Sequence, residues 1–319
     1  MTAWQSLARH DLGLLNRVDS ILARAAAEYA ITISRLRHSR TLLVASDYAG
    51  QHAGSTHEVY SYLLTTPGAW ASWDAARTVL RSRSRLGSRR FAYKKLADRL
   101  RQQALPHFLH AAGAFEALSV SLIVDKRLGS LFSNHGRLDL ASPDFEPYRL
   151  WPQGSLERLL RVTHFLALLI AGVSSPSQDL VWFTDQDEIA ANPERLTALT
   201  RAFALVSSHL LSHDLRNLRC GTTASDTGIR DIEDFASIPD LVAGALSELA
   251  ATLRRSGITL SELIISVPSA VPGRCRTILE WLSDASLQLA RVVILLEQPL
   301  DRGGVTLKRL RLHGMLGAV

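Results

Sequence analysis

The stretch TLLVASDYAG (residues 41–50) carries the main fold signal of the chain. Residues 41–46 form a continuous apolar run that ends at a charged residue and a glycine-containing loop, and this pattern predicts a buried β-strand. Asp47 comes directly after the run. A carboxylate at the end of a buried strand is costly unless a metal ion or hydrogen bonds neutralise it, so Asp47 is a candidate functional residue.

Along the rest of the chain, segments with the hydrophobic pattern of a strand alternate with segments with the hydrophobic pattern of a helix. Strands are predicted at residues 41–46, 57–66, 118–124, 180–184 and 215–222. Helices are predicted at residues 5–29, at 70–112 around a basic interruption, and at 156–171, 193–211 and 239–253. This order predicts an α/β fold with a mixed five-stranded sheet flanked by helices. Two further strand-like runs, 263–267 and 292–296, extend this sheet or form a small separate lobe.

The same order divides the chain into three predicted segments. Residues 1–39 form an N-terminal helical segment, and residues 40–257 form the main domain with a basic insertion at 70–112. Residues 258–319 form a C-terminal α/β extension.

Composition excludes several classes of protein. The chain has 319 residues, 47% of them hydrophobic, which is enough to bury a sizeable core. Its two cysteines, Cys220 and Cys275, cannot form a disulfide framework or a thiolate zinc cage. The longest apolar run, 165–173, is much shorter than a membrane-spanning helix, and the N-terminus lacks the pattern of a signal peptide. We therefore expect a soluble cytoplasmic protein without membrane association.

Sequence motifs exclude two common catalytic classes. The chain contains no Gly-x-Ser-x-Gly elbow, which argues against a serine hydrolase of the α/β-hydrolase type. It also contains no Gly-x-x-x-x-Gly-Lys-Ser/Thr loop for binding nucleotide phosphates.

Two more aspartates occupy positions that compare with Asp47. Asp185 follows the predicted strand 180–184, and Asp240 lies in the first turn of the predicted helix 239–253. Carboxylate oxygens without nearby cysteines or paired histidines suit Mg²⁺ or Mn²⁺, and two such ions can promote phosphodiester cleavage. The alternative is that these residues are turn formers or favour a helix dipole.

The order of these motifs resembles that of the ribonuclease H-like superfamily. The motifs are VASDYAG around Asp47, WFTDQDE around Asp185 and SIPDLVAGAL around Asp240, and they span about residues 40–255. They are most similar to a poorly characterised bacterial family whose first strand ends in Asp-Glu-Ser-Gly. The resemblance implies a ribonuclease H-like sheet, a metal-dependent nuclease activity, and catalytic and metal-binding roles for Asp47, Asp185 and Asp240. It also places a helix-borne catalytic acid at Glu157.

The sequence departs from that family at one place. Tyr48 and Ala49 stand where the family has glutamate and serine, so one acidic group is missing. Asp187 or Glu58 compensates, or the module is catalytically inactive and binds nucleic acid or a protein partner.

A basic segment at residues 81–95 is the second functional signal. It carries seven positive charges and no acid, and its basic residues are Arg81, Arg83, Arg85, Arg89, Arg90, Lys94 and Lys95. Such a segment can follow a nucleic-acid backbone while Phe91 and Tyr93 stack on bases. The alternative is a solvated loop that serves solubility.

The low polarity of residues 156–171 also permits a homo-oligomer interface.

Overall fold

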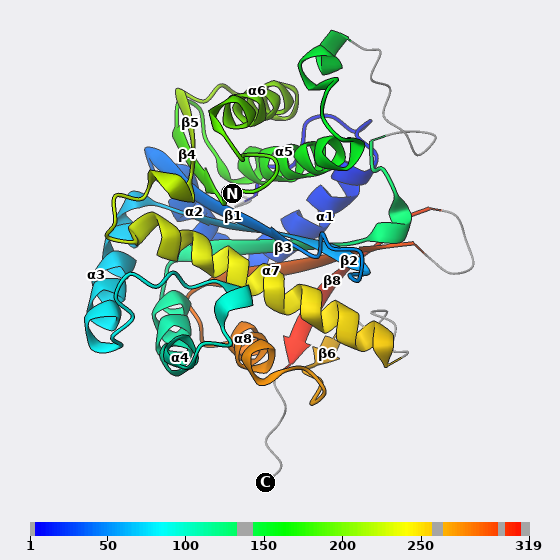
Figure 1. Ribbon diagram of the computed structural model, residues 1–319. Helices are drawn as coiled ribbons and strands as arrows, with labels where there is room; N and C mark the ends of the chain where they lie inside the picture. The colour runs from blue at the N-terminus through cyan, green and yellow to red at the C-terminus, as the bar shows by residue number, and fades with distance from the viewer. Residues whose placement is uncertain (1–3, 133–142, 257–263, 299–303, 314–319) are drawn as a thin grey trace. The chain divides into compact units, whose positions relative to one another are not determined.

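The protein is a mixed α/β structure, known here from a computed structural model that describes residues 4–132, 143–256, 264–298 and 304–313 (Figure 1). It divides into two units that alternate along the chain. Unit 1 comprises Met1–Leu42 and Arg127–Ala224, and unit 2 comprises Leu43–Lys126 and Ser225–Val319. The division at residues 39/40 and 257/258 stays a prediction.

Unit 1 places helices beside a pair of parallel strands. Its described elements are α1 (Leu14–Ala26), α2 (Ala30–His38), α5 (Gln153–Val173), β4 (Asp179–Thr184), α6 (Pro193–Leu210) and β5 (Asn217–Thr222). β4 and β5 pair in parallel, and α5 packs against α1, α2 and α6. The Asn192 side chain accepts a hydrogen bond from the backbone of Arg195 at 2.8 Å, so α6 starts with an N-cap followed by a proline.

Unit 2 is built on a sheet in the strand order β1-β2-β3-β7-β8-β6. Its strands are β1 (Thr41–Ala49), β2 (His57–Thr65), β3 (Ala117–Asp125), β6 (Ile264–Ser266), β7 (Ala290–Glu297) and β8 (Thr306–His313). Its α-helices are α3 (Pro67–Arg83), α4 (Arg99–Gly113), α7 (Asp231–Arg255) and α8 (Gly273–Ser283). β1, β2 and β3 form an antiparallel meander, β7 joins β3 in parallel, and β8 pairs antiparallel with β7. α7 packs on β2 and β3, with α8 beside it (Figure 1).

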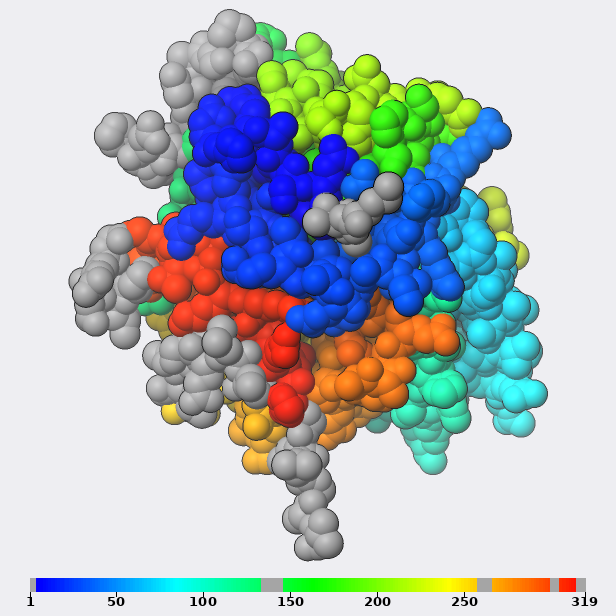
Figure 2. Space-filling view, turned by 180° about the vertical axis from the view of Figure 1, so that it is seen from behind, coloured from blue at the N-terminus to red at the C-terminus, as the bar shows by residue number. Residues whose placement is uncertain are grey.

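Most of the predicted elements are confirmed. Every predicted strand has a counterpart, and the run at 292–296 lies in β7, which joins the sheet of unit 2 through β3. The helix predicted at 5–29 begins later, at Leu14, and is interrupted before α2. The prediction of five strands omitted β8, which lies at the surface of unit 2 (Figure 2). Three basic residues in β8 hide its alternating pattern.

Two predicted positions need correction, because β1 and α7 are both longer than expected. Asp47 does not follow β1 but lies inside it, since pairing with β2 continues to Ala49. Asp240 is not in the first turn of its helix, because α7 begins at Asp231 and continues through Pro239. The early start has a physical cause. Asp226 accepts hydrogen bonds from the backbone N–H groups of Gly228, Arg230 and Glu233, which caps the helix.

One described helix, α7, is long and apolar enough by length and composition to cross a membrane. However, 72% of its most apolar window is buried inside the structure. That burial is typical of a core helix in a soluble protein, and it gives no support to a membrane-spanning role.

Candidate functional site

Asp47 lies on β1, an outer strand of the antiparallel meander of unit 2. Its partner on β2 is Ser61, which in turn pairs with Ser121 on β3. The hydroxyl oxygens of Ser61 and Ser121 are 2.8 Å apart. Asp47 is 8% exposed, so strand pairing holds a nearly buried carboxylate on the serine-bearing face of this part of the sheet.

Tyr48 stands where the family that the sequence resembles has a glutamate. Side chains alternate along a strand, so Tyr48 points to the opposite face from Asp47. Its hydroxyl lies 2.7 Å from the Ser46 hydroxyl, and its ring contacts those of Tyr60 and Tyr62 at centroid distances of 5.8 and 6.4 Å. Tyr48 is therefore a core residue.

The end of β4 in unit 1 gathers several acids. As predicted, Asp185 comes directly after β4, and its carboxylate accepts a hydrogen bond from the Thr223 hydroxyl at 2.9 Å. Asp187 accepts one from the Ile189 backbone at 3.1 Å. Burial raises the pKa of Asp187 to about 6, and the charges of Asp185 and Glu188 add to that rise. A carboxylate surrounded in this way is a recognised sign of a functional position.

Glu157 is engaged in a different way. The sequence predicted that Glu157 lies in the first turn of its helix. However, α5 begins at Gln153, so Glu157 lies in the second turn. Its carboxylate accepts hydrogen bonds from Arg161 at 2.8 Å, from the Ser130 hydroxyl at 2.7 Å and from the Leu131 backbone at 2.9 Å. These donors already engage the Glu157 carboxylate, and the role of helix-borne catalytic acid that the resemblance gives to Glu157 stays a prediction.

Glu58, like Asp187, is a candidate to compensate for the glutamate that is missing at position 48. It lies on β2, and its carboxylate accepts a hydrogen bond from the Tyr60 hydroxyl. Tyr60 is 1% exposed, so Glu58 has a structural contact with a core tyrosine.

Asp240 connects the predicted acidic site with the basic segment of unit 2. Its carboxylate accepts a hydrogen bond from the backbone N–H of Tyr93 at 2.6 Å. The Tyr93 hydroxyl donates to Glu248, and a Cβ atom at Gly244 would lie 2.2 Å from the Tyr93 ring. Asp240, Gly244 and Glu248 are four residues apart and so share one face of α7. That face therefore holds Tyr93 at three points, and Gly244 is required for the ring to fit.

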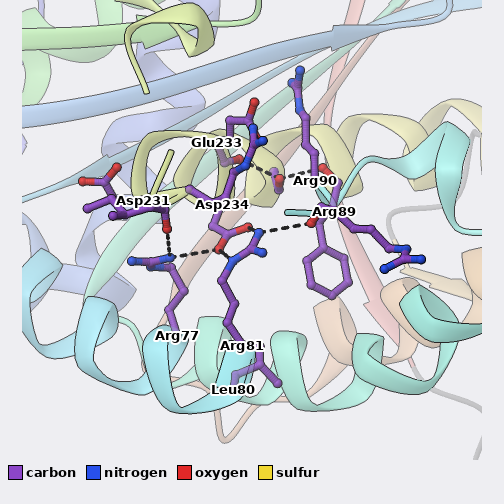
Figure 3. Close-up of polar contacts among 12 residues, drawn as sticks. Arg77, Leu80, Arg81, Arg89, Arg90, Asp231, Glu233 and Asp234 are labelled. Atoms are coloured by element: carbon purple, nitrogen blue, oxygen red, sulfur yellow. Dashed lines mark hydrogen bonds and ion pairs between the residues drawn. The ribbon is translucent and has the colours of Figure 1, made fainter. Parts of the chain in front are cut away.

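The start of α7 holds the basic segment through a buried ion-pair network (Figure 3). Asp234 is fully buried and pairs with Arg81 and Arg77. Arg77 also donates to the Ile229 carbonyl at 2.9 Å and pairs with Asp74. Burial raises the pKa of Asp234 above its ordinary value, while the hydrogen bonds and charges of the two arginines act in the opposite direction.

The carbonyl groups of the loop after α3 are bound by side chains from the surrounding helices. Arg81 donates to the carbonyls of Gly87 at 2.8 Å and Arg89 at 3.3 Å. Arg101 donates to the Arg90 carbonyl at 2.8 Å, and the Ser237 hydroxyl donates to that of Phe91 at 2.8 Å. These contacts to its carbonyl groups fix the backbone of the loop, and a preformed backbone loses less conformational entropy when a partner binds.

The basic residues divide into two groups. Arg81 is committed to the network, and Arg90 is half-buried. The exposed members of the segment are Arg83, Arg85, Arg89, Lys94 and Lys95.

The aromatic residues of the segment do not have the role expected of them. Phe91 is 1% exposed and packs against Phe108 with ring centroids 4.4 Å apart. Tyr93 is held against α7, and Arg274 lies 5.3 Å from the centre of its ring. The expectation that these rings stack on bases was wrong, because both serve to anchor the loop.

The predicted acids are distributed over both units. Asp47 and Asp240 belong to unit 2, whereas Asp185 and Glu157 belong to unit 1. Within either unit, over the residues described, no group of three or more His, Cys, Asp or Glu side chains is arranged to hold a metal ion. The metal site that combines Asp47, Asp185 and Asp240 therefore stays a prediction.

Sequence reasoning overlooked Asp234 and Glu248, which hold the basic segment in place. Asp234 had a usable signal, since acids in the first turn of a helix favour its dipole and could have marked the start of α7. Glu248 had none, because its partner Tyr93 is 155 residues away in sequence.

Comparison with known proteins finds distant structural similarity alone. No protein-family profile matches the chain, and no curated protein sequence matches it. A chain of the PCNA:RNase HII complex from Archaeoglobus fulgidus is similar with a TM-score of 0.35 and 14% identity. The similarity covers 78% of this chain and 93% of that chain. At this TM-score the likeness supports no statement about fold or function.

Proposed function

We propose that the protein is a divalent-metal-dependent nuclease, or a related phosphodiester-processing enzyme, of the ribonuclease H-like type. In this proposal Asp47, Asp185 and Asp240 supply the carboxylates. One observation carries most weight: the Asp240 carboxylate accepts a hydrogen bond from Tyr93, inside the basic segment, at 2.6 Å. A candidate metal ligand and the candidate nucleic-acid-binding loop are therefore in direct contact within unit 2.

The donor chemistry fits Mg²⁺ or Mn²⁺. The candidate ligands are all carboxylate oxygens, which hard divalent cations prefer. At the end of β4, burial raises the pKa of Asp187, and the charges of Asp185 and Glu188 add to that rise while Arg158 opposes it. When bound, such ions supply an activated water and stabilise the leaving oxygen of a phosphodiester. We include Asp187 as an additional acid, since Arg161 and two other donors already engage Glu157.

The basic loop supplies nucleic-acid binding. Arg83, Arg85, Arg89, Lys94 and Lys95 are exposed, and phosphate contacts of this kind give affinity without reading sequence. Because the loop is already fixed by Arg81, Arg101 and Ser237, little conformational entropy is lost when a phosphate backbone binds.

A second function remains in competition: a catalytically inactive module that binds nucleic acid or a protein partner. Tyr48 favours it, because this core residue occupies the position where the related family has an acid. The two functions share the basic loop and differ only in metal-dependent chemistry.

Cleavage of labelled single- and double-stranded DNA and RNA in Mg²⁺, Mn²⁺ or a chelator tests the proposal. We expect cleavage that requires the metal and falls at least about 100-fold in Asp47→Asn and Asp185→Asn, because losing a ligand costs more than losing a residue that orients a ligand, which costs roughly 10–100-fold. Asp179→Asn is the matched control at the opposite end of β4 and should retain activity. If wild-type protein binds nucleic acid but cleaves none of the substrates, the inactive module is correct.

Binding is tested separately by anisotropy at several salt concentrations. In Lys94→Gln/Lys95→Gln, the slope of log K against log salt for duplex DNA should become shallower by roughly 1.8, or about 0.9 for each lost phosphate contact. An unchanged slope would exclude these lysines from the interface.

A further inference from the structure

A groove between α3 and α4 in unit 2 shares only Arg83 and Arg85 with the residues proposed to bind nucleic acid. The two helices lie side by side (Figures 1 and 2), and the cavity between them has a volume of about 1110 Å³. This is at the upper end of the range for small-molecule sites, and such sites are mostly apolar with a few polar groups.

Just over half of the residues that line the groove are apolar, and Ser72, His107 and His110 lie among them. Small side chains on α3 and α4 leave the space open, and they include Ala69, Ala76, Ala104 and Ala111. Trp73 and Phe115, each 2% exposed, also line the groove and stack with ring centroids 5.3 Å apart. The Trp73 indole Nε1 is buried and has no hydrogen-bond partner among the described residues, which is unusual for a buried donor.

The ends of the groove differ in charge. Arg83 and Arg85, near the C-terminal end of α3, line one end together with Leu100 and Gln103 of α4. Neither arginine has an ion-pair partner among the residues described, and both are exposed. Glu116 lines the groove together with Gly68 from the start of α3, so its carboxylate belongs to the other end.

We propose that this groove binds an amphiphile with a long apolar chain and a single anionic head group, either a carboxylate or a phosphate. The chain lies over Trp73 and the alanines, and the head group pairs with Arg83 and Arg85. From Ala69 to Arg83 the helix rises about 21 Å at 1.5 Å per residue, which suits an extended chain. Burial of the chain supplies affinity, and charge-assisted hydrogen bonds to the arginines fix the orientation.

A nucleic acid suits this groove less well. Its charges are spread evenly along the backbone, whereas the groove has two arginines at one end and a carboxylate at the other. An amphiphile with one charged end matches both features. The inference does not depend on the proposed nuclease activity.

Titration calorimetry with four twelve-carbon probes, each below its micelle concentration, tests the proposal. Dodecanoate and dodecyl phosphate should each bind one per chain, and comparing them identifies the preferred head group. Dodecanol should bind roughly tenfold more weakly, because it lacks the charge-assisted contacts, and dodecyltrimethylammonium more weakly still. Equal binding of all four probes would overturn the role of the arginines.

Three variants locate the site. Ala76→Trp fills the groove from an exposed helix position and should weaken dodecanoate binding at least tenfold without changing metal-dependent cleavage. Arg83→Gln/Arg85→Gln should weaken the anionic probes but not dodecanol. Lys94→Gln/Lys95→Gln, outside the groove, should leave all probes unaffected while nucleic-acid binding falls. Wild-type affinity in Ala76→Trp would overturn the proposal.

A fluorescence experiment on wild-type protein locates the probe without relying on the folding of a groove-filling variant. Brominated dodecanoate should quench tryptophan emission, and much of that quenching should be lost in Trp73→Phe. Quenching that is the same in both proteins would place the probe elsewhere. Displacement of dodecanol, which does not need Arg83 and Arg85, by an oligonucleotide would instead assign the groove to the nucleic-acid interface and overturn the amphiphile.

Discussion

The start of α7 and the end of β4 each contain an aspartate whose pKa is raised by burial, yet their neighbours differ. Around Asp234 on α7, the arginines at positions 77 and 81 oppose the effect of burial. Around Asp187 after β4, the acids at 185 and 188 add to it, with Arg158 acting against them. The first arrangement is electrically compensated and stabilises a loop. In the second, Arg158 opposes burial more strongly than either neighbouring acid supports it, and burial still raises the pKa. A carboxyl with a raised pKa is suited to moving a proton.

Removing the compensated charge should have the largest effect on stability. Asp234→Asn leaves Arg77 and Arg81, 4% and 11% exposed, without their buried counter-charge. Breaking a buried pair from one side costs about 3–5 kcal/mol, so urea unfolding should show a loss of that size. Asp74→Asn is the matched control, since Asp74 also pairs with Arg77 but is 37% exposed, and it should cost less than about 1 kcal/mol. Equal losses would show that burial of the pair is unimportant.

Asp187 should make stability depend on pH in the weakly acidic range. Its pKa rises from about 3.9 in the unfolded chain to about 6, so the folded state binds the proton more tightly. The resulting stabilisation is complete below pH 4 and is lost as the pH rises through 6, by about 1–3 kcal/mol. Asp187→Asn should remove that dependence while it keeps an acceptor for the Ile189 N–H. Free energies of unfolding measured from pH 4 to 7 test this prediction. The same change of stability with pH in wild-type and Asp187→Asn protein would contradict the assignment of the pH dependence to Asp187.

These two regions also show what the sequence could and could not reveal. The strand before Asp185 was predictable because LVWFT is a local apolar run, and so was β1. The network at Asp234 was not, since it joins Arg81 to a residue 153 positions away. Pro239 resembled a helix start, and only the cap from Asp226 shows why α7 begins eight residues earlier. Phe91 is not available for stacking because it packs against Phe108, and no local sequence pattern specifies that contact.

The influence of Asp185 on Asp187 offers a smaller and more specific test. If like charge adds to burial at the end of β4, Asp185→Asn should lower the pKa of Asp187 from about 6. NMR titration of the carboxyl carbon measures this directly. Asp179→Asn, at the start of the strand, should leave it unchanged. An unchanged pKa in Asp185→Asn would mean that burial alone accounts for the rise and that the contrast with α7 is weaker than we infer.

The start of β4 should show the smallest effect, and with the opposite sign. Hydrogen bonds from Arg216 and then Asn217 lower the pKa of the exposed Asp179 carboxyl to about 2. Its contribution is therefore present above the unfolded pKa near 3.9 and is lost as the pH falls toward 2. Arg216→Gln should reduce stability slightly above pH 4, with the two proteins converging at lower pH, because an exposed pair is well screened. A difference that grows between pH 4 and 6 would instead couple this pair to Asp187, and the two ends of β4 would then act as one electrostatic unit.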